Sequence, residues 1–473
     1  MAFNSIHFLL FFPLVLAAAW ALRRHASLRI GFLLAASYYF YMSWNVTYAG
    51  LILGSTVLDF FVAKRIHGAA GAGTKRAWLV ASLTGNLGVL FLFKYYNFFA
   101  DSICEVLSAG GRDMQASPLA LLLPVGISFY TFQTLSYTID VYRGRIEPAT
   151  NFVKFALFVS FFPQLVAGPI VRASHFLPQL ELQPKFDDRA SETGMGQMLL
   201  GVFKKVCIAD LLGATLVDPV FASPNASGSW TLLIAMYGYA FQIYYDFSGY
   251  SDIAIGAARM LGFNLPVNFN RPYLATSLRN FWCRWHISLS TWLRDYLFIP
   301  LGGSRGSSWK IARNLAIVML LGGLWHGAAW GFVLWGGVHG LLLVAGRVFH
   351  SLTGIDADSE DQPLVSRIAR IAVTFNLVAG CLVMFRATDF PTLWAYLSRL
   401  VTFQPGGSTV SATAYAILAL GMLLEWMPRS WLAGAAGLYL RLPSVAQAGV
   451  ITGCLFVFAA VGGMSAPFIY FQF

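Results

Sequence analysis

The chain has 473 residues, of which 57% are hydrophobic and only 11% are charged. Soluble domains carry about 25% charged residues, so this composition excludes an ordinary soluble protein and indicates a polytopic membrane protein. The net charge of +11 suggests basic cytoplasmic loops that contact anionic membrane lipids. No basic soluble region is long enough to predict a nucleic-acid-binding protein.

Apolar segments recur along almost the whole chain. A membrane-spanning helix needs about 20 such residues. Since some segments are short and others long, we expect one all-α membrane domain over residues 1–473. It should have about eleven to thirteen spans, with re-entrant and interfacial helices among them. The candidate segments are 6–22, 30–44, 46–63, 77–99, 119–139, 152–170, 197–221, 230–262, 312–349, 365–386, 411–427 and 445–464.

The basic loops predict the orientation of the spans, because Lys and Arg gather on the cytoplasmic side. Three arginines follow the first segment and four basic residues follow the third, so both of these loops fit the cytoplasm. Arg429 and Arg441 flank the loop before the last segment. We therefore expect both termini on the outer side of the membrane.

The hydrophilic stretch 263–313 is a further basic region. Between Arg271 and Arg313 it holds seven Lys and Arg residues against one acid, Asp295, so it is also expected in the cytoplasm. Large apolar residues recur in it at helical spacing, which predicts one amphipathic helix that could lie along the membrane surface. These residues are Trp282, Trp285, Leu289, Trp292 and Tyr296.

His326 is the residue in the apolar segments that is hardest to explain by packing. Ionisable groups in membrane spans are costly and usually face a bundle interior or a watery cavity, and histidine is a natural proton carrier. The segment 312–349 around it is long for one span and short for two. Glycines four residues apart on both sides of Trp325 and His326 predict either a close helix approach or a helix break. A structural histidine bonded to a carbonyl is the alternative.

Two more histidines lie near this region. His286 follows the basic and aromatic run from Arg279 to Trp285, where it is a candidate partner of His326 or simply an interfacial residue. His339 is thirteen residues after His326, which amounts to about 220° around a continuous helix. A continuous helix would not align the two side chains, so we expect a structural role for His339.

Asp246 and Asp252 place two carboxylates in an apolar segment, on either side of Tyr250. Buried acids need partners. They could orient histidines, bind substrate hydroxyls or pair with arginines, and a purely structural network is equally open. No Cys or His spacing indicates a metal site. The sequence contains neither a G-x-S-x-G elbow nor a P-loop, so a histidine acting as general base on a hydroxyl fits best, a role worth about 10²- to 10⁴-fold in rate.

Four stretches carry a resemblance to a known family, and they lie at 124–133, 245–252, 279–300 and 322–330. They resemble the membrane-bound O-acyltransferases, and in particular the branch that acetylates bacterial polysaccharides such as alginate. The tail from Pro467 to Phe473 also looks like that branch. In the resemblance His326 matches the near-invariant histidine of the family, and His286 matches its second conserved polar position.

The resemblance implies a funnel-shaped helical bundle in which His326 and His286 are catalytic. It implies acetyl-CoA as a cytoplasmic donor, no bound cofactor, and an acceptor on the outer side. Periplasmic partners of the SGNH-hydrolase type would complete the transfer to an exported polysaccharide. Residues expected to bind or orient the substrate are Asp246, Tyr250, Asp252, Trp325 and Arg284, and residues expected to bind the partner are Phe468, Tyr470, Phe471 and Phe473.

Other functions remain open at this point. The acceptor could be another glycan, such as cellulose or peptidoglycan, because these would share the same motifs. A transporter in which His326 relays protons is a different class. A scaffold that recruits periplasmic enzymes through the aromatic tail is a third.

Overall fold

The structure is a computed structural model that describes residues 1–112, 114, 117–183, 185–359, 362–406, 409–461 and 468–469. Helices make up most of these residues, and none of the residues described lies in a strand, so the predicted all-α class is confirmed. The chain folds as two compact units, Met1–Gly194 with Ala254–Pro266, and Met195–Ile253 with Val267–Phe473. That residues 1–473 form a single domain stays a prediction.

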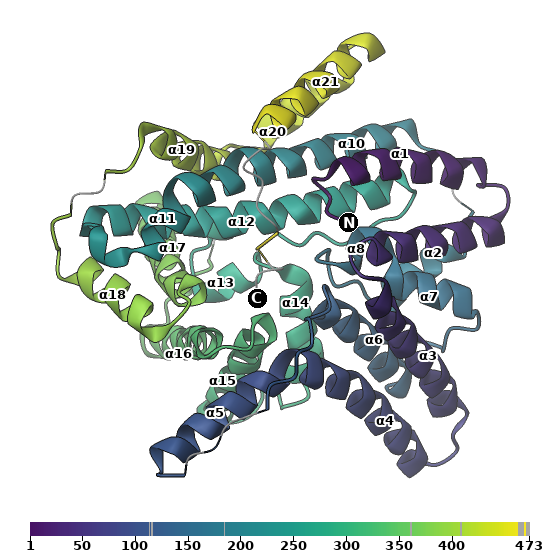
Figure 1. The fold of residues 1–473 in the computed structure, drawn as a ribbon, viewed down its shortest axis with the longest axis horizontal. Helices are drawn as coiled ribbons and strands as arrows, with labels where there is room; N and C mark the ends of the chain where they lie inside the picture. The colour runs from purple at the N-terminus through teal and green to yellow at the C-terminus, as the bar shows by residue number, and fades with distance from the viewer. Residues whose placement is uncertain are drawn as a thin grey trace. The chain divides into compact units, whose positions relative to one another are not determined.

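The first unit begins with four helices that follow one another closely along the chain (Figure 1). Phenylalanine rings fill its interior: Phe162 is fully buried, and its ring centroid lies 5.5 Å from that of Phe40 and 5.3 Å from that of Phe11. The helices are α1 (Ile6–Ala21), α2 (Ala26–Met42), α3 (Val46–Gly68), α4 (Ala72–Leu90), α5 (Tyr96–Ala109), α6 (Ile127–Tyr142), α7 (Phe152–Ser160), α8 (Phe162–Leu165), α9 (Ala173–Phe176) and the first part of α10 (Asp188–Phe203).

Two predicted spans in the first unit are wrong in their limits. Helix α6 begins only at Ile127, because Gly126 before it has a left-handed backbone with a φ of 77°, which a helix cannot continue through. The span predicted at 152–170 breaks after α7. The carbonyl oxygen of Phe158 there accepts hydrogen bonds from the side-chain amides of Gln133 (2.6 Å) and Gln164 (2.7 Å). Such polar cover allows irregular backbone inside a membrane protein.

The second unit is built around residues 229–253 of the long helix α12 (Ser229–Met260). The second part of α10 packs tightly against them, since a Cβ on Gly201 would lie 2.5 Å from the carbonyl oxygen of Gly249. Short segments of π-helix extend the helical runs at Lys204–Asp210, Gly213–Val217 and Arg294–Phe298. The other helices are α11 (Asp218–Ala222), α13 (Leu278–Trp282), α14 (Ile287–Leu293), α15 (Ser308–His326), α16 (Trp330–Thr353), α17 (Leu364–Arg386), α18 (Phe390–Val401), α19 (Ala412–Trp426), α20 (Arg429–Leu440) and α21 (Ser444–Val461).

The segment 312–349 folds as a helical hairpin, in which α15 ends at His326 and α16 begins at Trp330 (Figure 1). Both expectations from its glycines hold, because the chain breaks between the helices and the helices also approach closely. A Cβ on Gly323 would lie 2.2 Å from the carbonyl oxygen of Phe332, and one on Gly336 would lie 2.3 Å from that of Met319. Only glycine allows this backbone contact.

The single amphipathic helix predicted from Trp282 to Tyr296 is wrong. The chain instead forms α13, a turn, and α14, and it breaks at His286, whose φ of 41° is left-handed. Trp285 and Leu289 are buried within the protein rather than laid on a membrane surface.

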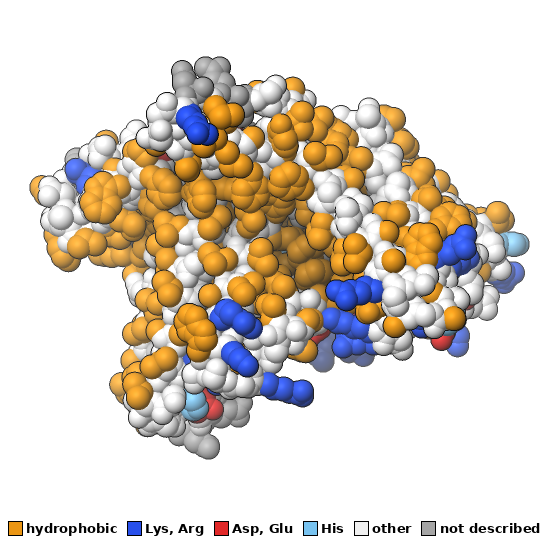
Figure 2. Space-filling model, turned by 90° about the horizontal axis from the view of Figure 1, so that it is seen from below, with side chains coloured by type: hydrophobic (Ala, Val, Ile, Leu, Met, Phe, Trp, Pro, Cys, Tyr) orange, Lys and Arg blue, Asp and Glu red, His pale blue; other side chains and the backbone are white. Residues whose placement is uncertain are grey.

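Four helical stretches are long and apolar enough to cross a membrane, namely Val46–Gly68, Ala72–Ala109, Trp330–Thr353 and Leu364–Arg386, counted over the residues that the structure describes. Large apolar side chains on them face outward, such as Leu341 (71% exposed) on α16. Hydrophobic side chains also cover much of the face seen in Figure 2, with Lys and Arg in a few groups. A surface this apolar fits contact with lipid. Helices α18 and α20 were not expected from the sequence.

Candidate functional site

Two buried histidines lie close together in the second unit. His286 precedes α14 and His326 ends α15, and their ring centroids are 6.5 Å apart. The indole of Trp325 touches both imidazoles, with centroid distances of 5.8 Å and 5.0 Å. The structure therefore brings together the two histidines that the sequence singled out, while their catalytic roles stay predictions.

His286 is held in place by Asn268. The amide oxygen of Asn268 lies 3.2 Å from Nδ1 of His286 and also accepts hydrogen bonds from the backbone N–H and the hydroxyl of Ser288. Since a backbone N–H can only donate, the atom of Asn268 that faces it is the oxygen, which can only accept. His286 therefore donates from Nδ1, and its neutral tautomer carries the lone pair on Nε2.

The environment of His286 keeps the imidazole uncharged. The residue lies between α13 and α14, outside the candidate spans, and it is fully buried. Burial lowers the pKa of His286 to about 3, because a charged ring loses its hydration there. His286 is therefore neutral at pH 7, which suits a hydrogen-bonding role better than storage of a proton.

His326 lies in an aromatic environment at the end of its helix. Its ring centroid is 5.3 Å from that of Trp335 and 5.3 Å from that of Phe385. The helix ends there because Gly327 follows in an extended conformation, and a Cβ at this position would lie 2.1 Å from the ring of Phe332. The glycine break thus places the imidazole at the turn between α15 and α16.

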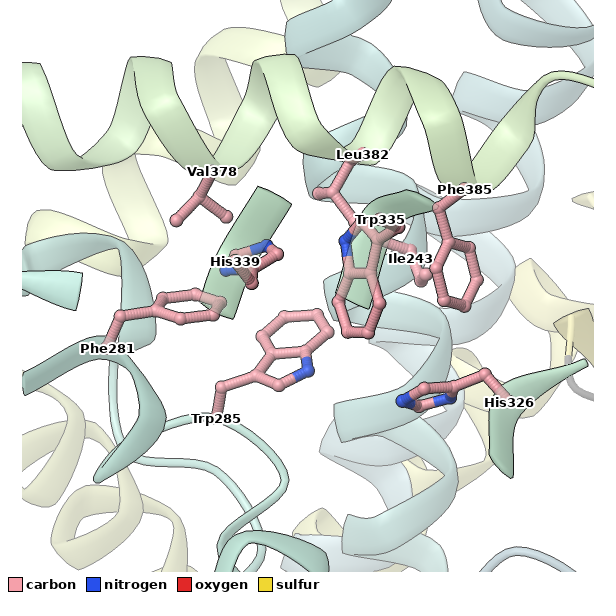
Figure 3. A pocket seen from close by; sticks show the side chains of 9 residues that line it. All are labelled: Ile243, Phe281, Trp285, His326, Trp335, His339, Val378, Leu382 and Phe385. Atoms are coloured by element: carbon pink, nitrogen blue, oxygen red, sulfur yellow. The ribbon is translucent and has the colours of Figure 1, made fainter. Parts of the chain in front are cut away.

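A small cavity opens beside His326, and it contains a second histidine, His339 (Figure 3). Its water-accessible volume is about 10 Å³, roughly the space of one water molecule. Apart from the two imidazoles, the walls are aromatic or aliphatic. The lining residues are Ile243, Phe281, Trp285, His326, Trp335, His339, Val378, Leu382 and Phe385.

A larger pocket of about 390 Å³ lies in the first unit, between residues 146–154 and 173–181. It contains the ion pair of Lys154 with Glu181 but no histidine. By size alone, this larger pocket would be the better candidate for a functional site. We place the candidate site at the smaller cavity, because the buried titratable groups converge there.

The two predicted aspartates pair with lysines rather than with the histidines. Asp246 is buried and lies 2.5 Å from the ammonium of Lys205, which also reaches Asp210 at 2.8 Å. Asp252 lies 2.6 Å from the ammonium of Lys204. Among the residues described, neither aspartate belongs to a cluster of His, Cys, Asp or Glu that could hold a metal. These contacts favour the structural network over the other roles.

Comparison with known proteins identifies the chain's family. Residues 145–384, which include His286, His326 and His339, match the model of the membrane-bound O-acyltransferases. The chain is 43% identical over 410 residues to "Probable alginate O-acetylase AlgI" of Pseudomonas aeruginosa, covering 85% of this chain and 75% of that one. The chain belongs to the membrane-bound O-acyltransferase family. It is an O-acyltransferase and a membrane protein.

Two other relatives show how broad the acceptors of related enzymes are. The acyltransferase is 36% identical over 395 residues to "Peptidoglycan O-acetyltransferase" of Helicobacter pylori, covering 78% of this chain and 73% of the relative. It is also 32% identical over 239 residues to "Teichoic acid D-alanyltransferase" of Streptococcus thermophilus, covering 48% of this chain and 57% of that one.

Three predicted site residues remain to be placed, namely Trp325, Arg284 and Tyr250. Trp325 contacts both histidines, as described above. Arg284 instead donates to the side-chain oxygen of Asn280 at 2.7 Å and shapes the turn between α13 and α14. Tyr250 is buried and its ring lies 4.6 Å from that of Phe468. The roles of these three residues in substrate binding stay predictions.

The C-terminal tail is described only at Phe468 and Ile469, and both are buried in the second unit. The backbone N–H of Ile469 donates to Asp246 at 2.9 Å. Tyr470, Phe471 and Phe473 lie outside the described residues. A partner-binding tail stays a prediction, although Phe468 itself offers little free surface.

Sequence reasoning missed several residues around the site. The expected site does not include Asn268, Lys204 or Lys205, and the sequence does not place His339 in the same cavity as His326. The two lysines could have been found from the sequence, since they are charged residues in the apolar segment 197–221. Burying them costs free energy, as it does for Asp246, unless they have partners. Asn268 could not have been found in this way, because its partner is fixed only by the fold.

Proposed function

We propose that this acyltransferase moves acetyl groups from cytoplasmic acetyl-CoA across the bacterial inner membrane for O-acetylation of an exported polysaccharide, with alginate as the first candidate. The observation that carries the proposal is the buried pair of His286 and His326. Their ring centroids lie 6.5 Å apart, and His326 lines a small aromatic cavity. The alginate O-acetylase named among its relatives supports the choice of acyl group and acceptor.

His326 acts as the general base in the reaction that we propose. It takes the proton of the acceptor hydroxyl while that oxygen attacks the carbonyl carbon of the thioester and forms the new C–O bond. The C–S bond then breaks, and the coenzyme thiolate takes the proton back from the imidazolium. No oxidant or further reactant is needed. His286, neutral and held by Asn268, orients the groups beside His326.

The membrane arrangement is part of the same proposal. It comprises about eleven to thirteen spans arranged as a funnel, with the basic stretch 271–313 on the cytoplasmic side and both termini in the periplasm. The basic stretch would attract the phosphates of the donor, although the same charges also satisfy the positive-inside rule. A periplasmic partner of the SGNH-hydrolase type would complete the transfer to the polymer, and the aromatic tail would bind it.

Peptidoglycan is a second candidate acceptor. The relative named for peptidoglycan O-acetylation matches over 78% of this chain, which supports this second candidate. The two are separated by measuring which polymer loses acetyl groups when the gene is deleted.

The test of the proposal is the acetyl content of the exported polymer in cells that carry His326→Ala in place of the wild-type chain. We expect loss of acetylation at normal levels of the protein in the membrane. His350→Ala is a matched control, because His350 is exposed and bonds only to the carbonyl of Ile355 among the contacts described. Normal acetylation with His326→Ala would refute the proposal.

A further inference from the structure

His339 is a buried histidine that the proposed reaction does not yet use. It lies on α16, one helical turn after Trp335, and its side chain is fully buried. Neither of its ring nitrogens has a hydrogen-bond partner within the described part of the chain. The indole N–H of Trp335 also has no hydrogen-bond partner within the described part of the chain. Two polar groups on one face of α16 are thus buried without partners there.

Such an arrangement is unfavourable unless something binds it. Native proteins pair almost all of their buried polar groups, and each exception calls for an explanation. If His339 served packing alone, a phenylalanine or leucine side chain would fill its place without the cost of an unsatisfied imidazole. The unsatisfied nitrogens therefore point to a polar ligand in the cavity that His339 lines.

The same cavity reaches His326. The ring of Trp335 contacts both imidazoles, with centroid distances of 5.3 Å to His326 and 4.8 Å to His339. Figure 3 shows this indole between the two histidines, with Trp285 below it. A continuous helix would place the two histidines on different faces, but the break after His326 lets α16 fold back so that both line one cavity.

We propose that His339 donates a hydrogen bond from its imidazole N–H to the carbonyl oxygen of the short acyl group that His326 helps to transfer. The inference rests on the proposed function and adds a substrate-binding residue to it. A thioester or ester carbonyl oxygen is the acceptor that a neutral imidazole N–H fits. The cavity beside it, of about 10 Å³, has space for a single oxygen atom such as that of a carbonyl but not for a long acyl chain.

The hydrogen bond matters most when the acceptor oxygen attacks. The electron pair of the C=O bond then moves onto the carbonyl oxygen, and a donor aimed at that oxygen stabilises the developing negative charge. The pair returns when the C–S bond breaks. His339 keeps its proton throughout, and proton transfer remains with His326.

The experiment compares two variants of the full chain, His339→Phe and His339→Gln, with His350→Gln as a control on the same helix. Two quantities are measured: transfer of label from radioactive acetyl-CoA in membrane vesicles, and the thermal unfolding midpoint in detergent. We expect His339→Phe to keep or raise the midpoint, because the imidazole has no hydrogen bond to lose, while transfer falls about 10²- to 10³-fold. His339→Gln retains an N–H donor and should recover part of that loss.

Two results would overturn the inference. One is wild-type transfer by His339→Phe. The other is a parallel fall of midpoint and transfer in both variants, which would show that His339 only supports packing. His326→Ala is measured alongside, because unimpaired transfer by that variant refutes the proposed function itself. An inactive His326→Ala together with a fully active His339→Phe refutes only the role of His339.

Discussion

The amide oxygen of Asn268 lies 3.2 Å from Nδ1 of His286 and fixes which nitrogen of that imidazole carries the proton. Asn268 is itself fully buried, and its amide donates to the hydroxyl of Ser251 at 3.3 Å. The histidine pair therefore depends on a residue that precedes it in the chain and that sits in no helix.

Asn268→Ala should lower both stability and acetylation. It leaves the Nδ1–H of His286 and the backbone N–H of Ser288 without the oxygen that accepts from them, and a buried donor left unsatisfied costs about 1–3 kcal/mol. Chemical unfolding of the purified protein and polymer acetylation measure the two effects. Asn376→Ala, at an exposed amide on α17, is the control. Wild-type behaviour of Asn268→Ala would show that the contact is unimportant.

Gly336→Ala should disrupt the hairpin of α15 and α16. The added Cβ would lie 2.3 Å from the carbonyl oxygen of Met319, which is backbone and cannot move aside cheaply. Overpacking of this kind costs about 1–3 kcal/mol. Gly346→Ala on the same helix is a matched control, since its Cβ meets nothing within 4 Å and alanine favours helix by up to about 1 kcal/mol. Equal unfolding midpoints for the two variants would contradict the packing described here.

Lys205→Met should destabilise the second unit strongly. It leaves Asp246 and Asp210 buried without the ammonium that contacts both, and breaking a buried ion pair costs about 3–5 kcal/mol. Lys154→Met removes a more exposed pair with Glu181, for which a loss of at most about 1 kcal/mol is expected. The fraction of monodisperse protein after detergent extraction reports the difference. A Lys205→Met protein as stable as Lys154→Met would mean that the cluster contributes little.

Stability should fall in mild acid because of His286. Its pKa is lowered from 6.5 to about 3 in the folded protein, so the unfolded chain binds more protons between these values. The contribution of the neutral imidazole is complete above pH 6.5 and is lost progressively as the pH falls toward 3. The wild type should therefore lose more of its unfolding midpoint between pH 7.5 and pH 5 than His286→Phe does. Parallel decreases in the two proteins would contradict the pKa assigned to His286.

Apolar length alone predicted several helices well. The segments expected at 46–63, 365–386 and 411–427 appear as α3, α17 and α19, because an uninterrupted apolar run of this length has no other way to satisfy its backbone in lipid. The positions where helices break were harder to predict. The left-handed backbone of His286 depends on tertiary contacts such as that with Asn268, which no local pattern encodes.

The candidate site was also predictable in part. The cost of a histidine in an apolar segment pointed to His326, and the aromatic run pointed to His286. The position of His339 beside His326 could not be predicted by a helical wheel, because a helical wheel applies only to a continuous helix and the chain breaks after His326. The glycines around His326 allowed both a break and a close approach, and the fold uses both.

The most direct test of the central claim is transfer of radioactive acetyl from acetyl-CoA by membrane vesicles that contain His326→Ala, compared with vesicles that contain wild type or His350→Ala at equal protein levels. The claim that His326 is the base of an acyl transfer predicts transfer by the wild type and by His350→Ala, and a loss of about 10²-fold or more with His326→Ala. Transfer by His326→Ala at the wild-type rate would contradict it.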